Sequence, residues 1–120
     1  MAKKILAVDD SVSMRQMVEL TLRTAGYEVV QAADGVEALE FARVGSVDLV
    51  LTDVNMPRMD GIQLVQELRA LANYKFVPML VLTTESSKEK KMEGKRAGAT
   101  GWIVKPFNAQ QLLGTIAKVI

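Results

Sequence analysis

The sequence predicts an α/β fold in which a doubly wound, five-stranded parallel sheet is covered by five helices. Short apolar runs alternate with longer helical segments along the chain. Four of the helical segments begin with a residue type that caps helix N-termini. Strands that alternate with helices are joined by right-handed crossovers, and the resulting parallel sheet is buried on both faces.

Five runs are expected to form the strands. They are Ile5–Val8, Tyr27–Ala33, Asp48–Thr52, Val77–Thr83 and Trp102–Val104. The second run is the most polar, because it includes Glu28 and Gln31. A polar strand is tolerated where it faces solvent, so we expect this strand at an edge of the sheet.

The first helix is predicted from about Ser13 to Ala25, where apolar residues recur at three- and four-residue spacing. Its predicted buried face consists of Met14, Met17, Val18, Leu22 and Ala25. Gly26 follows as the residue that ends the helix.

The other four helices are each predicted from a capping pair, in which an Asp, Ser or Asn precedes a Glu or Gln by three residues. The pairs are Asp34 with Glu37, Asp60 with Gln63, Ser86 with Glu89, and Asn108 with Gln111. The first three of these helices are expected to end near Val44, Leu71 and Ala97. Asp34 and Asp60 are therefore assigned to capping alone. The stretch 88–96 has five basic and two acidic residues, which is typical of a solvated helix.

The composition is that of an ordinary globular protein, and it excludes several kinds of site. The 120 residues, 49% of them apolar, are enough for one domain, which we expect to span residues 1–120. A net charge of +1 gives no reason to expect a nucleic acid or a membrane as a partner. Without Cys or His, the chain has no disulfide, zinc–thiolate site, imidazole ligand or Ser–His catalytic pair. Any metal must bind to oxygen, which favours magnesium, calcium or manganese.

Neither a secretory segment nor a membrane span is predicted. The N-terminal apolar run is short and ends in two aspartates. Every apolar run is much shorter than the roughly 18 residues that a membrane span needs. We therefore expect a cytoplasmic protein.

Acidic side chains follow two of the predicted strands. Asp9 and Asp10 come directly after the first strand, and Asp53 comes after the third. If these strands are neighbours, the three carboxylates meet at the carboxyl edge of the sheet, where open α/β folds bind their ligands. Two like charges about 4 Å apart repel by roughly 4 kcal/mol at an effective dielectric near 20. The cluster therefore requires a cation, for which Lys105 is one candidate and a divalent metal the stronger one.

Two further polar groups fall at the same edge. Thr83 ends the fourth predicted strand, and Lys105 follows the fifth. Carboxylates, a hydroxyl, an ammonium group and a metal together suit a phosphoryl group. Lys105 and the metal neutralise its oxygens, Thr83 donates a hydrogen bond, and a carboxylate can accept the group.

Taken together, the motifs resemble the receiver domain of bacterial two-component response regulators, and among these the single-domain chemotaxis regulators. The segments that carry the resemblance are Asp9-Asp10, Asp53 with Asn55-Met56-Pro57 and Asp60-Gly61, Thr83-Thr84-Glu85, and Lys105-Pro106-Phe107. They occur in order and cover the chain from end to end. The resemblance implies the flavodoxin-like strand order 2-1-3-4-5 and a cis peptide bond between Lys105 and Pro106.

By this resemblance, Asp53 is the residue that is phosphorylated. Asp10 and Asp53 bind Mg²⁺ through their carboxylates, Asn55 binds it through its backbone carbonyl, and Asp9 holds a metal-bound water. Asn55 and Glu85 tune the hydrolysis of the phosphoaspartate, because they lie two residues beyond Asp53 and Thr83.

The same resemblance implies a conformational switch. The hydroxyl of Thr83 moves to a phosphoryl oxygen, Lys105 is its cationic partner, and Trp102 moves together with Thr83. Trp102 stands where the family usually has Tyr or Phe, so the aromatic ring at this position is larger than usual.

The implied function is a signalling switch rather than an enzyme, with self-phosphorylation and autodephosphorylation as its own chemistry. A partner histidine kinase supplies the phosphoryl group, because this chain has no His. Phosphorylation reshapes the face formed by the fourth helix, fifth strand and fifth helix, which binds a target protein, by resemblance a flagellar motor switch protein. A phosphatase is a further candidate partner, and we expect a monomer.

Three alternatives stay open. The chain can be a receiver domain of a longer regulator or a phosphorelay intermediate. It can be a metal-dependent phosphohydrolase that forms an aspartyl-phosphate, although we find no general acid or lid after Asp53. The third alternative is a flavodoxin-like cofactor binder, which needs a phosphate-binding loop where this chain has Asp9-Asp10.

Overall fold

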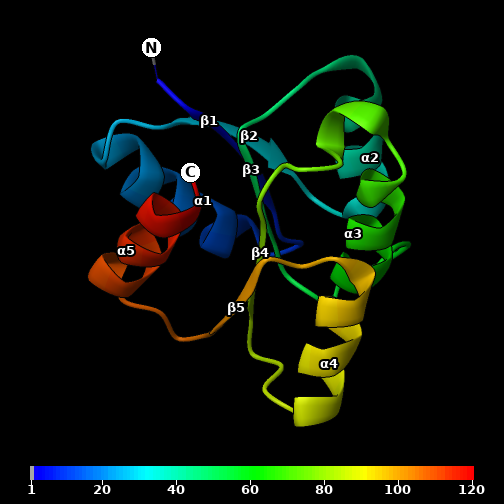
Figure 1. The fold of residues 1–120 in the computed structure, drawn as a ribbon. Helices are drawn as coiled ribbons and strands as arrows, with labels where there is room; N and C mark the ends of the chain where they lie inside the picture. The colour runs from blue at the N-terminus through cyan, green and yellow to red at the C-terminus, as the bar shows by residue number, and fades with distance from the viewer. Residues whose placement is uncertain (1) are drawn as a thin grey trace.

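The computed structural model describes residues 2–120 and contains alternating strands and helices (Figure 1). The strands are β1 (Lys4–Val8), β2 (Glu28–Ala32), β3 (Leu49–Thr52), β4 (Met79–Thr83) and β5 (Gly101–Val104). The helices are α1 (Val12–Thr24), α2 (Gly35–Val44), α3 (Gly61–Arg69), α4 (Lys88–Ala97) and α5 (Ala109–Val119), with a short 3-10 turn η1 (Ala72–Tyr74) between α3 and β4. The predicted elements are confirmed, except that η1 was not expected.

The five strands form one parallel sheet in the order β2-β1-β3-β4-β5. This confirms the doubly wound, flavodoxin-like order and the edge position of β2. The register aligns the last residue of β1 with that of β3 and the last residue of β4 with that of β5, since Val8 pairs with Thr52 and Thr83 pairs with Val104. Thr52 pairs with Val81, so β4 extends two residues beyond the end of β3. The residues that follow β1, β3, β4 and β5 are therefore delivered to one edge of the sheet.

The sheet separates two hydrophobic cores. Helices α1 and α5 cover one face, and α2, α3 and α4 lie on the other (Figure 1). Successive strand residues point to opposite faces, so Ile5 and Ala7 pack under α1 and α5 while Leu6 and Val8 pack under α2 and α3. This explains why the central strands are apolar except at their ends, where β1 begins with Lys4 and β3 and β4 end in Thr52 and Thr83.

Side-chain caps fix the starts of the helices that follow the sheet edge. Asp34 accepts a hydrogen bond from the backbone N–H of Glu37, and Asn108 caps α5 in the same way. Asp60 forms a complete capping box with Gln63, because each side chain bonds the other residue's backbone N–H. These three predicted caps are confirmed.

Two predicted helix starts are wrong by one residue. Helix α1 begins at Val12 rather than Ser13, because the side chain of Ser11 accepts from the N–H of Met14. Helix α4 is capped by Ser87 rather than Ser86, since it is the Ser87 hydroxyl that accepts from the N–H of Lys90.

The buried face of α1 is narrower than predicted. Val18 and Leu22 are buried and Met14 is half-buried, but Met17 is 55% exposed and Ala25 is also exposed. Met17 is one residue from Val18, a turn of about 100° around the helix, and this directs it away from the sheet. Gly26 has the left-handed φ of +96° that ends a helix, as predicted.

Arg69, the last residue of α3, joins three segments of the chain. Its Nε and Nη2 donate to the carbonyl of Gly98, at 3.1 and 2.8 Å, just after α4. Its Nη1 donates to the carbonyls of Tyr74, Lys75 and Val77, in and after η1. Burial lowers the pKa of Arg69, yet its charge is satisfied entirely by carbonyl dipoles among the described residues.

Among residues 2–120, no helix combines the length and the apolar character that crossing a membrane requires.

Candidate functional site

Three carboxylates meet where β1 and β3 end. The N–H of Asp53 donates to the carbonyl of Val8 at 3.0 Å, so Asp53 lies beside Asp9. Asp9, Asp10 and Asp53 each offer a carboxylate oxygen, and these oxygens lie within 4.8 Å of one another. The predicted acidic cluster is therefore formed.

Lys105 bridges two of these carboxylates. Its Nζ lies 2.8 Å from Oδ2 of Asp9 and 3.1 Å from Oδ2 of Asp53, and only 9% of its side chain is exposed. Burial alone would lower the pKa of Lys105, but the hydrogen bonds and charges of Asp9 and Asp53 outweigh it and raise that pKa. The site thus keeps one fixed ammonium against three carboxylates, and a net negative charge attracts a further cation.

The remaining carboxylate oxygens suit a hard divalent metal. Oδ1 of Asp53 accepts from the N–H of Val54 at 2.6 Å, and Oδ1 of Asp9 accepts from the N–H of Ser11 at 2.9 Å. Asp10 is exposed, and within residues 2–120 its carboxylate has no hydrogen-bond partner. A set of oxygen donors with one free carboxylate fits Mg²⁺.

Thr83 and Trp102 are linked through the backbone of Glu85. Thr83 is fully buried, and its hydroxyl oxygen accepts from the N–H of Glu85 at 3.2 Å. The indole N–H of Trp102 donates to the carbonyl of Glu85 at 2.9 Å. Thr83 and Trp102 are therefore hydrogen-bonded to the backbone of the same residue.

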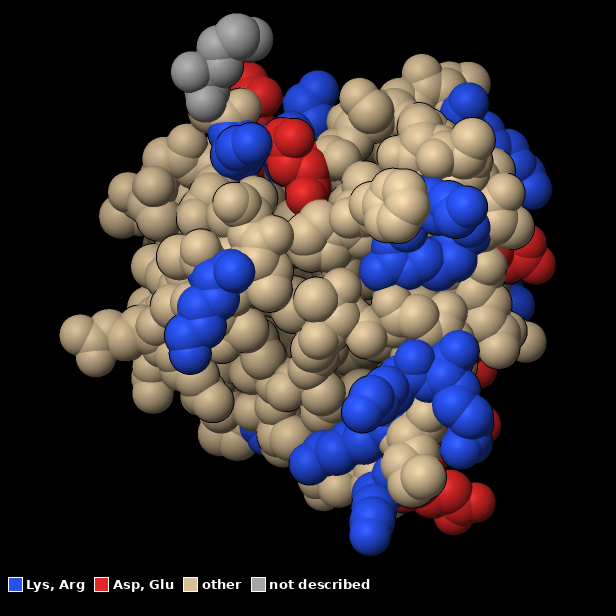
Figure 2. All heavy atoms as spheres, viewed as in Figure 1, with Lys and Arg blue, Asp and Glu red and all other residues tan. Residues whose placement is uncertain are grey.

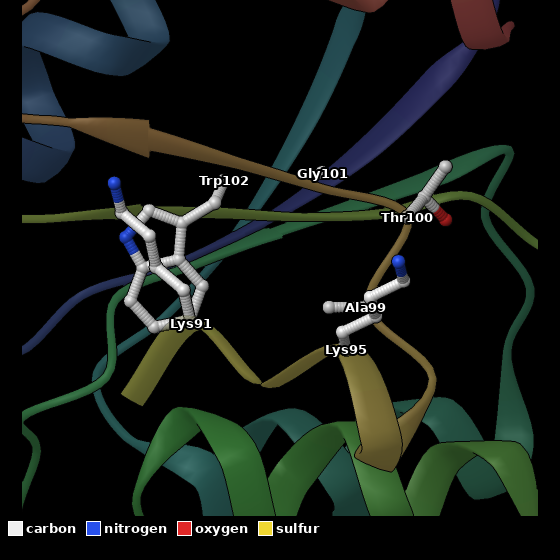
Figure 3. Close-up of a pocket in the computed structure, with 6 residues that line it drawn as sticks. All are labelled: Lys91, Lys95, Ala99, Thr100, Gly101 and Trp102. Atoms are coloured by element: carbon white, nitrogen blue, oxygen red, sulfur yellow. The ribbon is translucent and has the colours of Figure 1, made fainter. Parts of the chain in front are cut away.

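The ring of Trp102 packs against Gly94 in the middle of α4. A Cβ atom at Gly94 would lie 2.7 Å from Cζ3 of the indole, closer than any carbon contact allows. Figure 3 shows the ring beside α4, where Lys91 and Lys95 line a pocket of about 310 Å³ together with β5. This pocket lies on the α4–β5 face and is separate from the acidic cluster.

Gly61 permits α3 to start against the end of β3. A Cβ atom at Gly61 would lie 1.9 Å from the carbonyl oxygen of Asp53, so a side chain there would displace the loop that carries Asp53. The N–H of Gly61 donates to the carbonyl of Val54 at 2.9 Å and closes this loop.

A family model for the response regulator receiver domain matches residues 5–117. The chain belongs to this family. Receiver domains are signalling proteins rather than conventional enzymes, they interact with histidine kinases and downstream targets, and they bind Mg²⁺ at an acidic pocket. A CheY-like response regulator accounts for the fold and for the acidic cluster.

Three similar proteins illustrate the range of this family. The chemotaxis response regulator CheY4 of Vibrio cholerae is 56% identical, with a TM-score of 0.95 and full coverage of both chains. The receiver domain of a sensor histidine kinase from Pseudomonas aeruginosa, with a magnesium ion in its active site cleft, is 29% identical, with a TM-score of 0.92 over 99% of this chain and 98% of that one. A probable transcriptional regulator of Cyanophora paradoxa is 40% identical over 118 residues, which are 98% of this chain and 48% of that protein.

The other predicted receiver residues lie in loops at the same edge. Asn55 is exposed in the loop after β3, and Glu85 is half-buried in the loop after β4. The peptide bond between Lys105 and Pro106 is cis, as the resemblance implied.

Two groups in this receiver domain were missed by the sequence analysis. Arg15 contacts the backbone carbonyl of Asp9, and nothing in the residue pattern distinguishes Arg15 from a surface arginine. Gly94 was not singled out, because nothing in the sequence indicates that the ring of Trp102 packs against this glycine of the helix.

Proposed function

We propose that this receiver domain is a phosphorylation-activated signalling switch and that Asp53 accepts the phosphoryl group from a partner histidine kinase. The observation that carries this proposal is the convergence of Asp53 with Lys105, Asp9 and Asp10 at the carboxyl edge of the sheet. In this arrangement the carboxylate of Asp53 lies beside one fixed cation, and among the described residues the carboxylate of Asp10 has no partner that would compete with a metal.

The transfer exchanges one bond to phosphorus for another. A carboxylate oxygen of Asp53 attacks the phosphorus of the kinase phosphohistidine, and a P–O bond forms while the P–N bond breaks. The imidazole nitrogen keeps the bonding electron pair and takes up a proton. Lys105 offsets charge on the phosphoryl oxygens, and bound Mg²⁺ would supply the remaining neutralisation.

The metal would be held by Asp10, Asp53 and the carbonyl of Asn55, with Asp9 acting through a water. Water later hydrolyses the acyl phosphate, and the side chains of Asn55 and Glu85, two residues beyond Asp53 and Thr83, tune this step. These two residues therefore set the lifetime of the phosphorylated form in this proposal.

Activation proceeds through the β4–α4 loop. When the hydroxyl of Thr83 donates to a phosphoryl oxygen, the hydrogen bond from the N–H of Glu85 is disturbed. The carbonyl of Glu85 holds the indole of Trp102, so the loop and the ring shift together. The equilibrium between two loop arrangements is thereby biased.

The output surface is the face formed by α4, β5 and α5. Lys and Arg side chains gather over α4 (Figure 2), where residues 88–96 have five basic and two acidic side chains. The pocket beside Trp102 opens on this face (Figure 3). Similarity to chemotaxis regulators makes a flagellar motor switch protein the first target to test, and a basic face suits an acidic segment of it.

A second candidate is the receiver part of a longer regulator. It is favoured by the 40% identity to a transcriptional regulator of which this chain spans 48%. The acidic site would work in the same way, but the α4–β5–α5 face would then contact an effector domain or a second receiver.

The test is phosphorylation by acetyl phosphate in the presence and absence of Mg²⁺, followed by intact mass and peptide mapping. We expect one phosphoryl group, dependent on Mg²⁺ and located on the peptide containing Asp53. Asp53→Ala should remove it, whereas Asp60→Asn, which alters a helix cap in the same loop, should retain it. Label that persists in Asp53→Ala with unchanged kinetics would refute the assignment. Sustained turnover of many phosphate esters per protein would instead indicate a phosphohydrolase.

A further inference from the structure

Both polar groups of the Asp9 backbone form hydrogen bonds to other parts of the chain. Nη1 of Arg15, on the second turn of α1, donates to the carbonyl oxygen of Asp9 at 2.6 Å. The N–H of Asp9 donates to the carbonyl of Ala32 in β2 at 3.2 Å. Together with the bonds of Ser11 and Lys105 to its carboxylate, every polar group of Asp9 is engaged.

Arg15 is itself fixed from a second side. Its Nε donates to Oε1 of Gln31 in β2 at 3.1 Å, and Nε2 of Gln31 in turn bonds the carboxylate of Glu19 on α1. Arg15 is half-buried between α1 and β2, and it forms no ion pair with a carboxylate within residues 2–120. Its planar guanidinium therefore spans a strand side chain and one backbone carbonyl at a defined angle.

Asp10 differs from Asp9 in the contacts of its side chain. Asp10 follows the fully engaged Asp9 directly, yet its own carboxylate is exposed and has no hydrogen-bond partner in the part of the chain that the structure describes. The direction of the Asp10 side chain depends on the peptide plane between Asp9 and Asp10, and the oxygen of that plane is the one that Arg15 holds. Arg15 also brings a positive charge to the backbone of Asp9 without occupying a carboxylate oxygen of the acidic cluster.

We propose that Arg15 is a positioning residue for the metal site: by fixing the Asp9 carbonyl, it orients the carboxylates of Asp9 and Asp10 for a divalent cation. This inference rests on the proposed Mg²⁺-dependent function and adds a residue to it. Outer groups that orient metal ligands commonly change affinity by 10- to 100-fold when they are removed.

The direction in which the Kd for Mg²⁺ changes when Arg15 is removed distinguishes a positioning role from a purely electrostatic one. Removal of a positive charge beside an acidic cluster strengthens the attraction for a cation by Coulomb's law alone. Loss of the orienting hydrogen bond weakens the attraction, because the carboxylates of Asp9 and Asp10 then sample arrangements that do not converge. A role for Arg15 as charge alone predicts tighter Mg²⁺ binding in its absence, and positioning predicts weaker binding.

The experiment measures urea unfolding over a range of Mg²⁺ concentrations, since a ligand that binds only the folded state raises stability according to its Kd. The variants are Arg15→Ala, Arg15→Lys and the control Arg23→Ala. Arg23 serves as the control because it also lies on α1 and donates to a β2 carbonyl, that of Val29. Its partner Glu19 also bonds Gln31, but Arg23→Ala leaves the bond from Arg15 to the Asp9 carbonyl in place.

We expect Arg15→Ala to raise the Kd for Mg²⁺ about tenfold, at the lower end of the usual range because it acts through the backbone. Arg15→Lys should raise it less, since an ammonium can reach the carbonyl but cannot also hold Gln31. Arg23→Ala should leave the Kd unchanged even if metal-free stability falls.

An unchanged or lower Kd in Arg15→Ala would overturn the positioning role. If that variant does not fold, Arg15→Lys decides, and a Kd equal to or below that of the wild type overturns the role. A wild-type protein that gains no stability from Mg²⁺ would overturn the proposed function itself, which distinguishes the two failures.

Discussion

Lys105 offsets part of the repulsion between the carboxylates of the acidic cluster. A buried ammonium between two carboxylates compensates their repulsion only because its geometry is good and both oxygens are within hydrogen-bond distance. Because its pKa is raised, Lys105 is charged at neutral pH, and its contribution to stability is fully present below the ordinary value of 10.5. That contribution is lost only when the pH rises through the higher folded-state pKa.

Lys105→Ala should leave Mg²⁺ binding largely intact and uncouple phosphorylation from output, because the phosphoryl group loses its cationic partner while the metal ligands stay. The measurement is the affinity of the protein for its target peptide with and without beryllofluoride, a phosphoryl mimic. Phosphorylation-dependent binding at the wild-type level in this variant would remove Lys105 from the mechanism.

The effects of substitutions at Gly94 and at Trp102 on the free energy of unfolding should depend on each other. Gly94→Ala gains roughly 1 kcal/mol of helix propensity but forces overpacking that costs about 1–3 kcal/mol against the indole. We therefore expect Gly94→Ala to destabilise the wild type and to stabilise Trp102→Phe, whose smaller ring leaves room for a methyl group. Urea unfolding of the four proteins measures the coupling, and additive effects would show that the ring and the glycine do not constrain each other.

At the scale of the elements, the start of α2 couples a helix to the loop that carries Asp53. Asp34 caps α2 and also pairs with Arg58, which has a left-handed φ of 68° in the β3–α3 loop. The N–H of Glu37 chiefly lowers the pKa of Asp34 below its ordinary value of 3.8, and Arg58 lowers it further. Ionised Asp34 therefore stabilises the fold above pH 3.8, and this contribution disappears as the pH falls through the lower folded-state pKa.

Asp34→Ala should cost about 1 kcal/mol of folding free energy at pH 7, the usual value for a lost N-cap. The difference from the wild type should shrink as the pH falls below 3.8, because the Asp34 carboxyl of the unfolded chain takes up a proton there, whereas that of the folded protein does so only at a lower pH. Thermal unfolding at pH 7 and pH 3 tests both statements. A difference that grows as the pH falls would contradict the assigned role of the carboxylate.

Helix starts could be predicted from the sequence where the capping pattern lies within a few neighbouring residues. Capping by Asp34, Asp60 and Asn108 depends on residues three apart, so the sequence alone locates those helix starts. Of the adjacent serines 86 and 87, the second caps α4, because backbone angles decide which hydroxyl reaches the helix. Met17 was wrongly placed in the core because helical spacing defines a stripe but not its width.

The site was predictable for a topological reason, and its supporting contacts were not. Aspartates that follow parallel strands reach one edge in any doubly wound sheet, so Asp9, Asp10 and Asp53 could be grouped from the sequence. The contact of Arg15 with Asp9, and that of Trp102 with Glu85, depend on side-chain rotamers and on the exact path of a loop. Residue spacing contains no information about these features.

At the scale of the whole molecule, the metal site links folding to ligand concentration. Mg²⁺ at 100 times its Kd should stabilise the protein by about 2.7 kcal/mol, because the unfolded chain does not hold three carboxylates together. Asp10→Asn should abolish this gain and slightly stabilise the metal-free protein, since it removes one charge from the cluster. Calorimetric melting with and without Mg²⁺ is the measurement. A Mg²⁺-dependent rise in Tm that survives in Asp10→Asn would locate the metal elsewhere.

Two of the five hydrogen bonds of Arg69, those to the carbonyl of Gly98, tie the C-terminal end of α4 to α3. We expect α4 to pivot about Gly98, so that its N-terminal end, next to the loop that contains Glu85, moves furthest. A ten-residue helix is about 15 Å long, so a rotation of about 10° moves its N-terminal end by roughly 2.5 Å and its C-terminal end hardly at all. A partner protein that binds α4 near Lys88 would therefore respond to the whole displacement, whereas one that binds near Arg96 would respond to almost none of it.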